Sequence, residues 1–451
     1  MEGKLKQILD LVGEYIDDKR LGDTWSPGDW VKYSGPSYDA EEYQRAIESL
    51  LSEWLVFGKN AAEFEFLFPR YLGKRQGILT NSGSSANLLM VSCLKSENKT
   101  PEKYRLKDGD KVITPVVCFP TTINPIIQNN LVPVFVDVEM PSLNIDLNAV
   151  EEVLSNDKNK EIKAIMFAHV LGNPPDMDRL MAIVDKYDLI FLEDACDALG
   201  SFYDGKKLGS FGVMSTCSFY PAHHMTMGEG GFVATDKARL KMSLASFRDW
   251  GRACYCNVKK PGDVTGGTAC GDRFKNWLPG CQEITYDHRY VFDEVGYNLK
   301  PIDMQAALGL TQLKKLPRME QARRDNFEKI YNIFKKYNDY FLLPEATEKS
   351  DPCWFGFLLI VKPTAPFSRQ EFVNYMEANK IQTRAYFTGN ALYHPAYKSF
   401  ASNYSDLKSK FPNADLATKG SVFLGTYLGL TDEKINYIKT TVDNFFEEFK
   451  K

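Results

Sequence analysis

The chain has 451 residues, of which 44% are hydrophobic and 25% are charged, a composition typical of folded globular proteins. Its 55 basic and 59 acidic residues leave a formal net charge of −4, which provides no overall attraction to nucleic acid or to an anionic membrane. The length is sufficient for a large core and for two or three domains.

We expect neither an export signal nor a membrane-spanning segment. No apolar run approaches the roughly 18 residues expected of a membrane-spanning helix. The first ten residues have an amphipathic helical pattern rather than that of a signal peptide. We therefore expect a cytoplasmic protein. In that compartment the nine cysteines are expected to be buried thiols, metal ligands or redox groups rather than disulfides.

The predicted elements divide the chain into three parts. Residues 1–60 are expected to be helical, with an aromatic and Gly/Pro-containing interruption at Trp25–Pro36. Residues 61–325 alternate short apolar runs with helical periods, which predicts a large domain whose mostly parallel sheet is covered by helices on both faces. The predicted strands are Lys111–Pro115, Val134–Val138, Ala164–His169, Leu189–Leu192 and Thr216–Tyr220.

The remaining segments differ from this pattern. Residues 251–290 are rich in Gly, Pro, Lys and Cys, which predicts a long functional loop. Residues 326–451 are expected to form a smaller C-terminal α/β domain. It would contain a strand at Trp354–Val361 and a terminal helix at Glu433–Lys450.

Small polar residues precede an apolar helical run at Leu88–Leu94. In this segment, Asn81–Asn87, the residues Gly83 and Ser84 would leave backbone N–H groups free to bind a phosphate. A simple helix cap is the alternative interpretation. Ser218, on a different predicted strand, would add a hydroxyl donor to the same phosphate.

An apolar strand ends in the acidic residues Glu193 and Asp194, at the place where open α/β sheets bind their ligands. A carboxylate at this place suits the protonated ring nitrogen of a pyridoxal-type cofactor, although a helix cap would also explain it. Phe119 follows another strand and would stack on the cofactor ring, or else pack as an ordinary core aromatic.

Taken in order, these segments resemble the DegT/DnrJ/EryC1/StrS family of sugar aminotransferases from about residue 40 to the C-terminal region. The resemblance implies an α/β protein of fold type I, the pyridoxal phosphate-dependent architecture of aspartate aminotransferase. A large, seven-stranded, mostly parallel domain would be joined to a small C-terminal domain. It also implies a homodimer, because Asn298 matches an asparagine that reaches the cofactor phosphate of the neighbouring subunit.

Within the resemblance each candidate residue has an implied role. Gly83, Ser84 and Ser218 match phosphate-binding positions, Phe119 matches the residue that stacks on the ring, and Asp194 matches the partner of the pyridinium nitrogen. The family's cofactor lysine, which forms a Schiff base, is replaced here by His223.

Imidazole cannot form that covalent bond, but it is a general acid and base near neutral pH. We therefore expect pyridoxamine 5′-phosphate (PMP) as the cofactor and His223 as the catalytic base. His223 would remove a proton from the cofactor's methylene carbon, and a hydroxyl would leave the adjacent sugar carbon. The neighbouring His224 is expected to be a packing residue.

Two subgroups of the family carry this histidine. One holds a [2Fe–2S] cluster that receives electrons from an NAD(P)H-dependent flavin/iron–sulfur reductase, and the other has no cluster and uses glutamate. Cys196 and Cys254 are separated by 57 intervening residues, and Cys254 and Cys256 by one, as in the iron–sulfur subgroup. The 13 residues between Cys256 and Cys270 exceed the spacing in that subgroup. Cys270 is nevertheless the expected fourth ligand, because its flanking residues match, and Cys281 is the reserve.

Four thiolates would hold either a [2Fe–2S] cluster or a zinc ion, and buried free thiols without a metal are the third alternative; we expect the cluster. The remaining cysteines are expected in the core; they are Cys93, Cys118, Cys217 and Cys353.

The sequence therefore predicts a PMP-dependent 3-dehydratase of a nucleotide-linked 4-keto-6-deoxyhexose, with CDP as the expected nucleotide. Its product would be a 3,6-dideoxyhexose precursor for lipopolysaccharide O-antigen or another glycan. A cluster-free, glutamate-dependent dehydratase is one alternative. A non-catalytic sugar-binding protein on an aminotransferase scaffold is the other.

Overall fold

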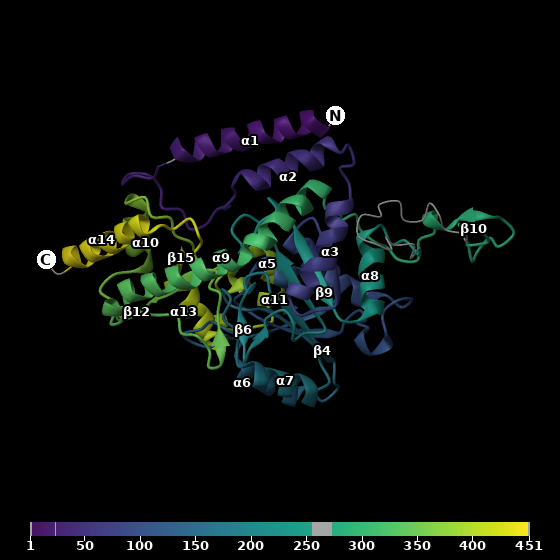
Figure 1. Cartoon of the computed structure of the whole chain (residues 1–451). Helices are drawn as coiled ribbons and strands as arrows, with labels where there is room; N and C mark the ends of the chain where they lie inside the picture. Colours follow the sequence, from purple (N-terminus) through teal and green to yellow (C-terminus); the bar gives the residue numbers. More distant parts are fainter. Residues whose placement is uncertain (1, 23, 255–272, 450–451) are drawn as a thin grey trace.

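The computed structural model describes residues 2–22, 24–254 and 273–449 (Figure 1). Its central feature is a seven-stranded sheet with the order β1-β9-β8-β5-β4-β2-β3. The strands from β3 to β8 pair in parallel, whereas β9 is antiparallel to both β8 and β1, so the expected mostly parallel sheet is confirmed. The seven strands are β1 (Gln76–Thr80), β2 (Lys111–Pro115), β3 (Val132–Val136), β4 (Ile162–Ala168), β5 (Ile190–Asp194), β8 (Met214–Ser218) and β9 (Gly231–Thr235).

All five strands predicted for this sheet are present, with ends that lie within two residues of the predicted ones. The sequence did not reveal β1 and β9. Each contains a glycine, which weakens the pattern of a strand. Gly77 of β1 is needed where it lies, because a Cβ atom there would come within 2.1 Å of the Phe232 ring on β9.

Alternate residues of the sheet face two separate hydrophobic cores, which is why its strands are continuous apolar runs. Ile113 and Phe191 belong to the core on one face, and Val112 and Leu192 belong to the core on the other. The first face is covered by α3 (Lys59–Tyr71), α6 (Leu147–Asn156), α7 (Met177–Lys186) and the start of α9 (Asp303–Phe334). The second face is covered by α4 (Gly83–Ser92), α5 (Pro120–Gln128) and α8 (Ala238–Arg248).

The C-terminal part is a smaller α/β unit around a three-stranded antiparallel sheet, in the order β12-β14-β15. Its elements are β12 (Phe341–Leu342), β14 (Gly356–Val361), α10 (Arg369–Ala378), α11 (Lys398–Ala401), α12 (Leu407–Lys410), α13 (Pro412–Gly420), β15 (Ser421–Gly425) and α14 (Asp432–Phe449).

The long helix α9 connects the two parts. Its residues Leu316 and Met319 pack in the core of the large sheet, and Ile330 and Phe334 pack in the core of the small one. The boundary expected at residues 325 and 326 lies inside this helix, between the two packing regions. The domain limits themselves remain a prediction.

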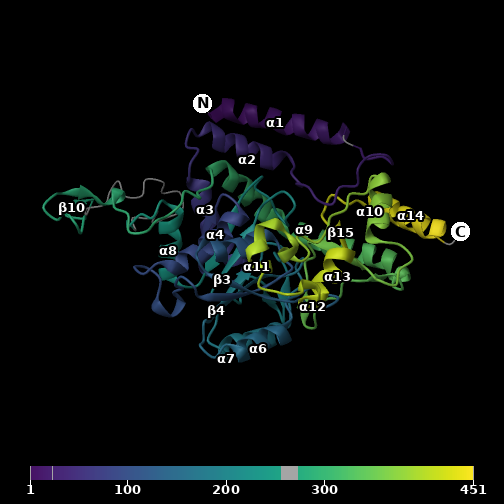
Figure 2. The same ribbon diagram turned by 180° about the vertical axis from the view of Figure 1, so that it is seen from behind.

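The N-terminal part contains α1 (Glu2–Gly22) and α2 (Ala40–Leu51), which lie side by side along one edge of the molecule (Figures 1 and 2). Between them the chain passes beside the small domain, where the backbone of Val31 pairs with Lys380 and Gln382. This crossing brings residue Tyr33 to the junction of the two domains.

Two small sheets complete the described structure. β6 (Phe202–Tyr203), β7 (Lys206–Lys207) and β13 (Ser350–Asp351) form one of them. The other, β10 (Phe274–Lys275) with β11 (Tyr286–Asp287), forms a hairpin that projects from the body in both views (Figures 1 and 2). This hairpin lies in the predicted loop 251–290, of which residues 255–272 are outside the described part.

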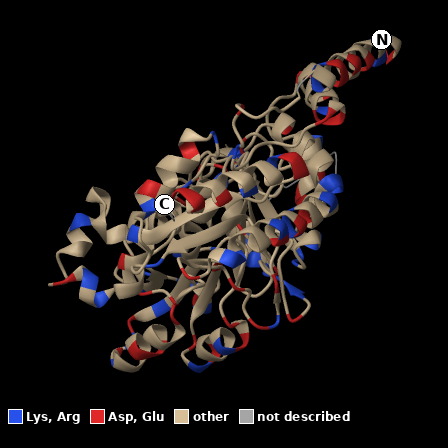
Figure 3. Cartoon of the chain, turned by 90° about the vertical axis from the view of Figure 1, so that its left-hand side faces the viewer, with Lys and Arg blue, Asp and Glu red and all other residues tan. Residues whose placement is uncertain are grey.

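Acidic and basic residues are interspersed on the helices seen in Figure 3, which agrees with the nearly balanced composition. Each helix in the described ranges is too short or too polar to cross a lipid bilayer.

Candidate active site

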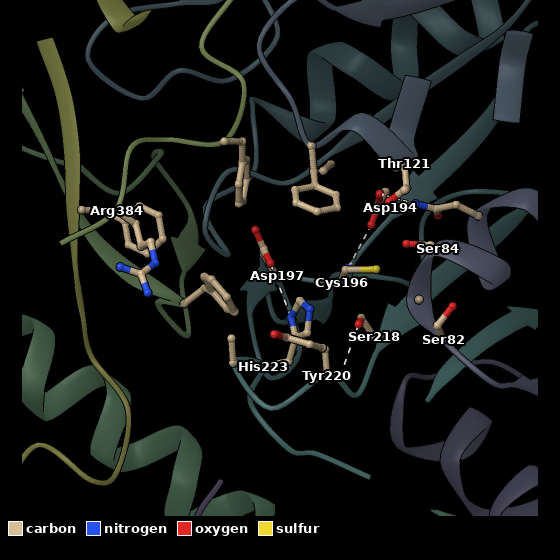
Figure 4. A pocket seen from close by; sticks show the side chains of 18 of the residues that line it. Ser82, Ser84, Thr121, Asp194, Cys196, Asp197, Ser218, Tyr220, His223 and Arg384 are labelled. Atoms are coloured by element: carbon tan, nitrogen blue, oxygen red, sulfur yellow. Dashed lines mark hydrogen bonds and ion pairs between the residues drawn. The ribbon is translucent and has the colours of Figure 1, made fainter. Parts of the chain in front are cut away.

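A cavity of about 520 Å³ opens where β5 and β8 end and where the small domain meets the large one (Figure 4). Both its size and its place at the carboxyl ends of parallel strands are typical of ligand sites. The structure brings most of the predicted site residues together in its wall; these are Gly83, Ser84, Phe119, Asp194, Cys196, Ser218 and His223.

One side of the cavity is an anion cradle at the first turn of α4. Ser82 caps this helix by accepting a hydrogen bond from the backbone N–H of Ser85 at 3.1 Å. Gly83 allows the helix to touch β8, because a Cβ atom at this position would lie 2.4 Å from Cβ of Ser218. The helix N-terminus and the hydroxyls of Ser84 and Ser218 therefore converge on a place that fits a phosphate.

Asp194 is a buried carboxylate that faces the cavity and is held by neutral donors. Its Oδ2 atom accepts hydrogen bonds from Asn87 and Thr122, both at 2.8 Å, and its Oδ1 atom accepts one from the Cys196 backbone at 3.1 Å. A negative charge that is only 3% exposed favours a positive partner in the cavity. A protonated pyridine nitrogen fits this requirement.

Asn87 and Thr122 were not recognised from the sequence as site residues. Asn87 also accepts a hydrogen bond from Thr216 at 2.6 Å, so a chain of polar groups from three elements orients Asp194. The one feature of the sequence that could have pointed to them is their position near the start of two helices that begin at the site.

Phe119 lies at the cavity wall with its ring partly free. It is 48% exposed and immediately precedes α5, and its ring centroid is 5.6 Å from that of Phe387 in an edge-to-face arrangement. A phenyl ring left open beside a cavity is available for stacking on a flat ligand.

His223 follows β8 and points into the cavity beside Asp197 (Figure 4). Its Nδ1 atom is 3.5 Å from Oδ1 of Asp197. Burial, with a contribution from the Arg323 charge, lowers the pKa of His223 to about 3, so the imidazole is neutral at physiological pH. Burial and the nearby Asp194 charge raise the pKa of Asp197 well above its usual range.

Asp197 is a residue that sequence reasoning missed, although it is close to Asp194 and Cys196 in the chain.

Arg323 of α9 supports the backbone of the segment that carries His223. This buried guanidinium donates hydrogen bonds to the carbonyls of Ala222 at 3.2 Å and His223 at 3.1 Å. His224 is buried on the other side, with Nε2 2.7 Å from the carbonyl oxygen of Cys353, as expected for a packing residue.

The structure places only part of the predicted cysteine set. Cys196 lines the cavity, and burial followed by the Asp194 charge raises the pKa of its thiol. Cys254 is at the edge of the described chain, and Cys256 and Cys270 lie outside the described residues. In the ranges that the structure describes, no group of three or more His, Cys, Asp or Glu side chains is arranged to hold a metal.

The reserve ligand Cys281 lies in the projecting hairpin between β10 and β11, 3.0 Å from Glu283, and does not line the cavity. The cysteines expected in the core are buried there: Cys93, Cys118, Cys217 and Cys353.

Asn298 is also outside the cavity of its own chain. Its backbone pairs with Asp249, and its side-chain oxygen accepts a hydrogen bond from Lys300 at 2.6 Å.

The sequence profile described as the DegT/DnrJ/EryC1/StrS aminotransferase family matches residues 36–443. The lipopolysaccharide biosynthesis protein RfbH of Salmonella typhimurium is 42% identical over 443 residues, which cover 98% of each chain. The dTDP-4-dehydro-2,6-dideoxy-D-glucose 3-dehydratase of Saccharopolyspora spinosa is 42% identical over 416 residues, which cover 92% of this chain and 86% of that protein.

Among solved structures, the chain is similar to a GDP-4-keto-6-deoxymannose-3-dehydratase with a trapped PLP–glutamate geminal diamine. The TM-score is 0.75 at 30% identity, with 91% of this chain and 99% of the other covered. This likeness confirms the fold type I architecture of a large, mostly parallel domain with a smaller C-terminal one. The chain belongs to the DegT/DnrJ/EryC1/StrS aminotransferase family.

Proposed function

We propose that this protein is a PMP-dependent 3-dehydratase of a nucleotide-linked 4-keto-6-deoxyhexose. One observation carries the proposal: a neutral imidazole, His223, lines the same cavity as the anion cradle on α4 and the buried carboxylate of Asp194. The family resemblance matches this histidine to the cofactor lysine. A chain without that lysine cannot hold the cofactor covalently there, which disfavours ordinary transamination.

The residues that would hold the cofactor are the ones that converge on the cavity. Gly83, Ser84 and Ser218 would bind its phosphate, and Asp194 would pair with its ring nitrogen. Phe119 would stack on its ring. When bound, PMP supplies an amine for the sugar ketone and an electron sink that permits loss of the neighbouring hydroxyl.

His223 would act as the general base. Its Nδ1 atom lies 3.5 Å from Oδ1 of Asp197, and the other ring nitrogen, Nε2, would take up the proton. The low pKa keeps the ring unprotonated and ready to accept that proton at physiological pH. Asp197 would fix the direction of the ring, and Arg323 would fix the backbone that carries it.

The names of the relatives support the substrate class and leave the nucleotide open. One is a 3-dehydratase of a dTDP-linked sugar, another is a 3-dehydratase of a GDP-linked sugar, and RfbH is named for lipopolysaccharide biosynthesis. CDP remains our prediction for the nucleotide, and a 3,6-dideoxyhexose our prediction for the product.

Two candidate functions differ in how the reaction is completed after the hydroxyl has left, either with glutamate or with electrons from a [2Fe–2S] cluster. The glutamate-dependent route has the support of a solved relative in which glutamate is joined to the cofactor. The [2Fe–2S] route rests on Cys196 in the cavity wall and on the spacing of Cys254, Cys256 and Cys270 in the sequence. Only the second route requires an NAD(P)H-dependent reductase as a partner.

We also propose that the active protein is a homodimer. Asn298 lies outside the cavity of its own chain, so contact with a cofactor phosphate would require the site of a second copy.

The proposal is tested by anaerobic turnover with CDP-, dTDP- and GDP-linked 4-keto-6-deoxyhexoses on PMP-loaded protein. Each substrate is given glutamate in one series and a chemical or enzymatic electron donor in another, and visible spectra and iron content are recorded first. Loss of the 3-hydroxyl with glutamate alone identifies the cluster-free enzyme. Iron–sulfur absorption with turnover only in the second series identifies the cluster enzyme, whereas PMP binding without any turnover contradicts both.

A further inference from the structure

The end of the cavity opposite the phosphate cradle is built around one guanidinium group. Figure 4 shows Arg384 across the cavity from Ser82, Ser84 and Ser218, with His223 and Asp197 between the two ends. Arg384 is the one Lys or Arg among the described residues that line the cavity. The cavity therefore offers an anion a second place to bind, separate from the cradle on α4.

Arg384 is held in position before any ligand arrives. Its backbone is paired with Phe423 of β15 by hydrogen bonds of 3.1 and 2.8 Å, and its guanidinium carbon lies 4.3 Å from the centroid of the Tyr33 ring. Nη1 donates to the carbonyl of Thr383 at 2.6 Å. Within the part of the chain that the structure describes, Nε and Nη2 have no hydrogen-bond partner, so the edge that binds a phosphate bidentately is free.

A row of aromatic rings separates this guanidinium from the catalytic imidazole. Centroid distances are 5.1 Å from His223 to Phe355, 6.4 Å from Phe355 to Phe423, and 5.9 Å from Phe423 to Tyr33. Such a wall can pack against the C–H groups of a sugar ring. The rings therefore place the guanidinium at the far end of this wall from His223.

We infer that Arg384, supported by Tyr33, forms the subsite for the diphosphate of the nucleotide-linked substrate, an inference that rests on the proposed function. In a nucleotide sugar the diphosphate is attached to C1, across the ring from the reacting carbons C3 and C4. The carboxylate of glutamate is the other anion that enters such a site. It is attached to the carbon that reacts, so it calls for a cation beside His223 rather than behind the aromatic rings.

The test compares Arg384→Gln and Arg384→Lys with Arg75→Gln, a control at an exposed arginine that does not line the cavity. Binding of CDP, dTDP and GDP to PMP-loaded protein is measured by calorimetry, together with the affinity for PMP itself. KM and kcat are then measured for the nucleotide sugar and for glutamate.

Loss of a charged hydrogen bond should weaken nucleoside diphosphate binding and raise the KM of the nucleotide sugar about 10- to 100-fold in Arg384→Gln. Arg384→Lys should lie between it and the native protein, and PMP binding, kcat and the KM of glutamate should change little. The Arg75 control should behave like the native protein.

Unchanged nucleoside diphosphate affinity in Arg384→Gln, or an effect confined to glutamate, would overturn the subsite and leave the proposed function standing. Nucleotide binding that depends on Arg384, but without any turnover, would support the subsite and overturn the proposed function. A native protein that binds none of the three nucleotides would contradict both.

Discussion

The Nδ1 atom of His223 lies 3.5 Å from Oδ1 of Asp197, in a cavity whose opposite ends are an anion cradle and a guanidinium group. This contact gives the imidazole a polar neighbour at Nδ1. In the proposed function the other nitrogen, Nε2, reacts, and Asp197 orients the ring without touching the sugar.

Replacement of Asp197 by Ala should lower kcat about 10²-fold, because an imidazole that loses its neighbour is no longer held in the productive orientation. KM and the affinity for PMP should stay close to the native values. Asp197→Asn keeps a polar group at the same place and should recover part of the rate. Steady-state kinetics with a PMP titration checks this, and equal kcat in the native protein and Asp197→Ala would contradict it.

His223→Asn should lower dehydration by at least about 10³-fold, since it removes the base while keeping a polar side chain of similar size. The variant should still bind PMP, because the cradle and Asp194 are unaffected. His223→Lys should instead bind pyridoxal phosphate covalently, which mass spectrometry after borohydride reduction would detect. Dehydration by His223→Asn at the native rate would rule out the base role.

The pH dependence of kcat should lack the inflection near pH 6.5 expected of an ordinary histidine base. Burial and the Arg323 charge hold the pKa of His223 at about 3, and a base is active above its pKa. Titration of His223 should therefore cause no change in kcat between pH 7 and pH 5. A rate profile recorded with saturating PMP checks it, and a one-proton loss of activity centred at pH 6 to 7 would show that the base has an ordinary pKa.

Gly83→Ala should weaken PMP binding and destabilise the fold by about 1–3 kcal/mol, because the added Cβ would lie 2.4 Å from Cβ of Ser218. Either the first turn of α4 or the end of β8 must then move. Gly280→Ala is the matched control, since nothing lies within 4 Å of its Cβ position. Thermal melts and PMP titrations compare the melting temperature and the PMP affinity of the two variants. Equal melting temperatures would mean that α4 shifts without any loss of stability.

Glu193→Gln should destabilise the fold most at neutral pH. The carboxylate is fully buried, and it accepts hydrogen bonds from His169 at 2.9 Å and from the backbone amides of Gly209, Phe211 and Gly212. Burial alone would raise its pKa, but these donors outweigh that effect and leave the pKa lowered.

A carboxyl whose pKa is lower in the folded than in the unfolded chain stabilises the fold above its unfolded value of about 4.3. That contribution is lost as the pH falls through the lower, folded value. The free energy of unfolding of Glu193→Gln should therefore be about 1–3 kcal/mol below native at pH 7, and the gap should narrow below about pH 4. Urea titrations at pH 7 and pH 3.5 test this, and a gap that widens in acid would contradict it.

Sequence reasoning found those parts of the site that are local in the chain. Gly83, Asp194 and Ser218 each stand at the end of a strand or the start of a helix, and parallel strands bring such ends to one edge of the sheet. The strands β1 and β9 were missed because their glycines weaken the local pattern, and what makes them strands is their pairing with each other across the sequence.

What the sequence by itself determined is the family and five of the seven strands of the large sheet, together with His223 as the candidate base, since these depend on residue identity and local order. Only the tertiary structure decided that Asp197 faces His223, that Asn87 and Thr122 hold Asp194, and that Tyr33 lies beneath Arg384. Contacts of this kind join side chains through the packing of separate elements. The directions of those side chains are set by which faces are buried together, and no spacing along the chain encodes that.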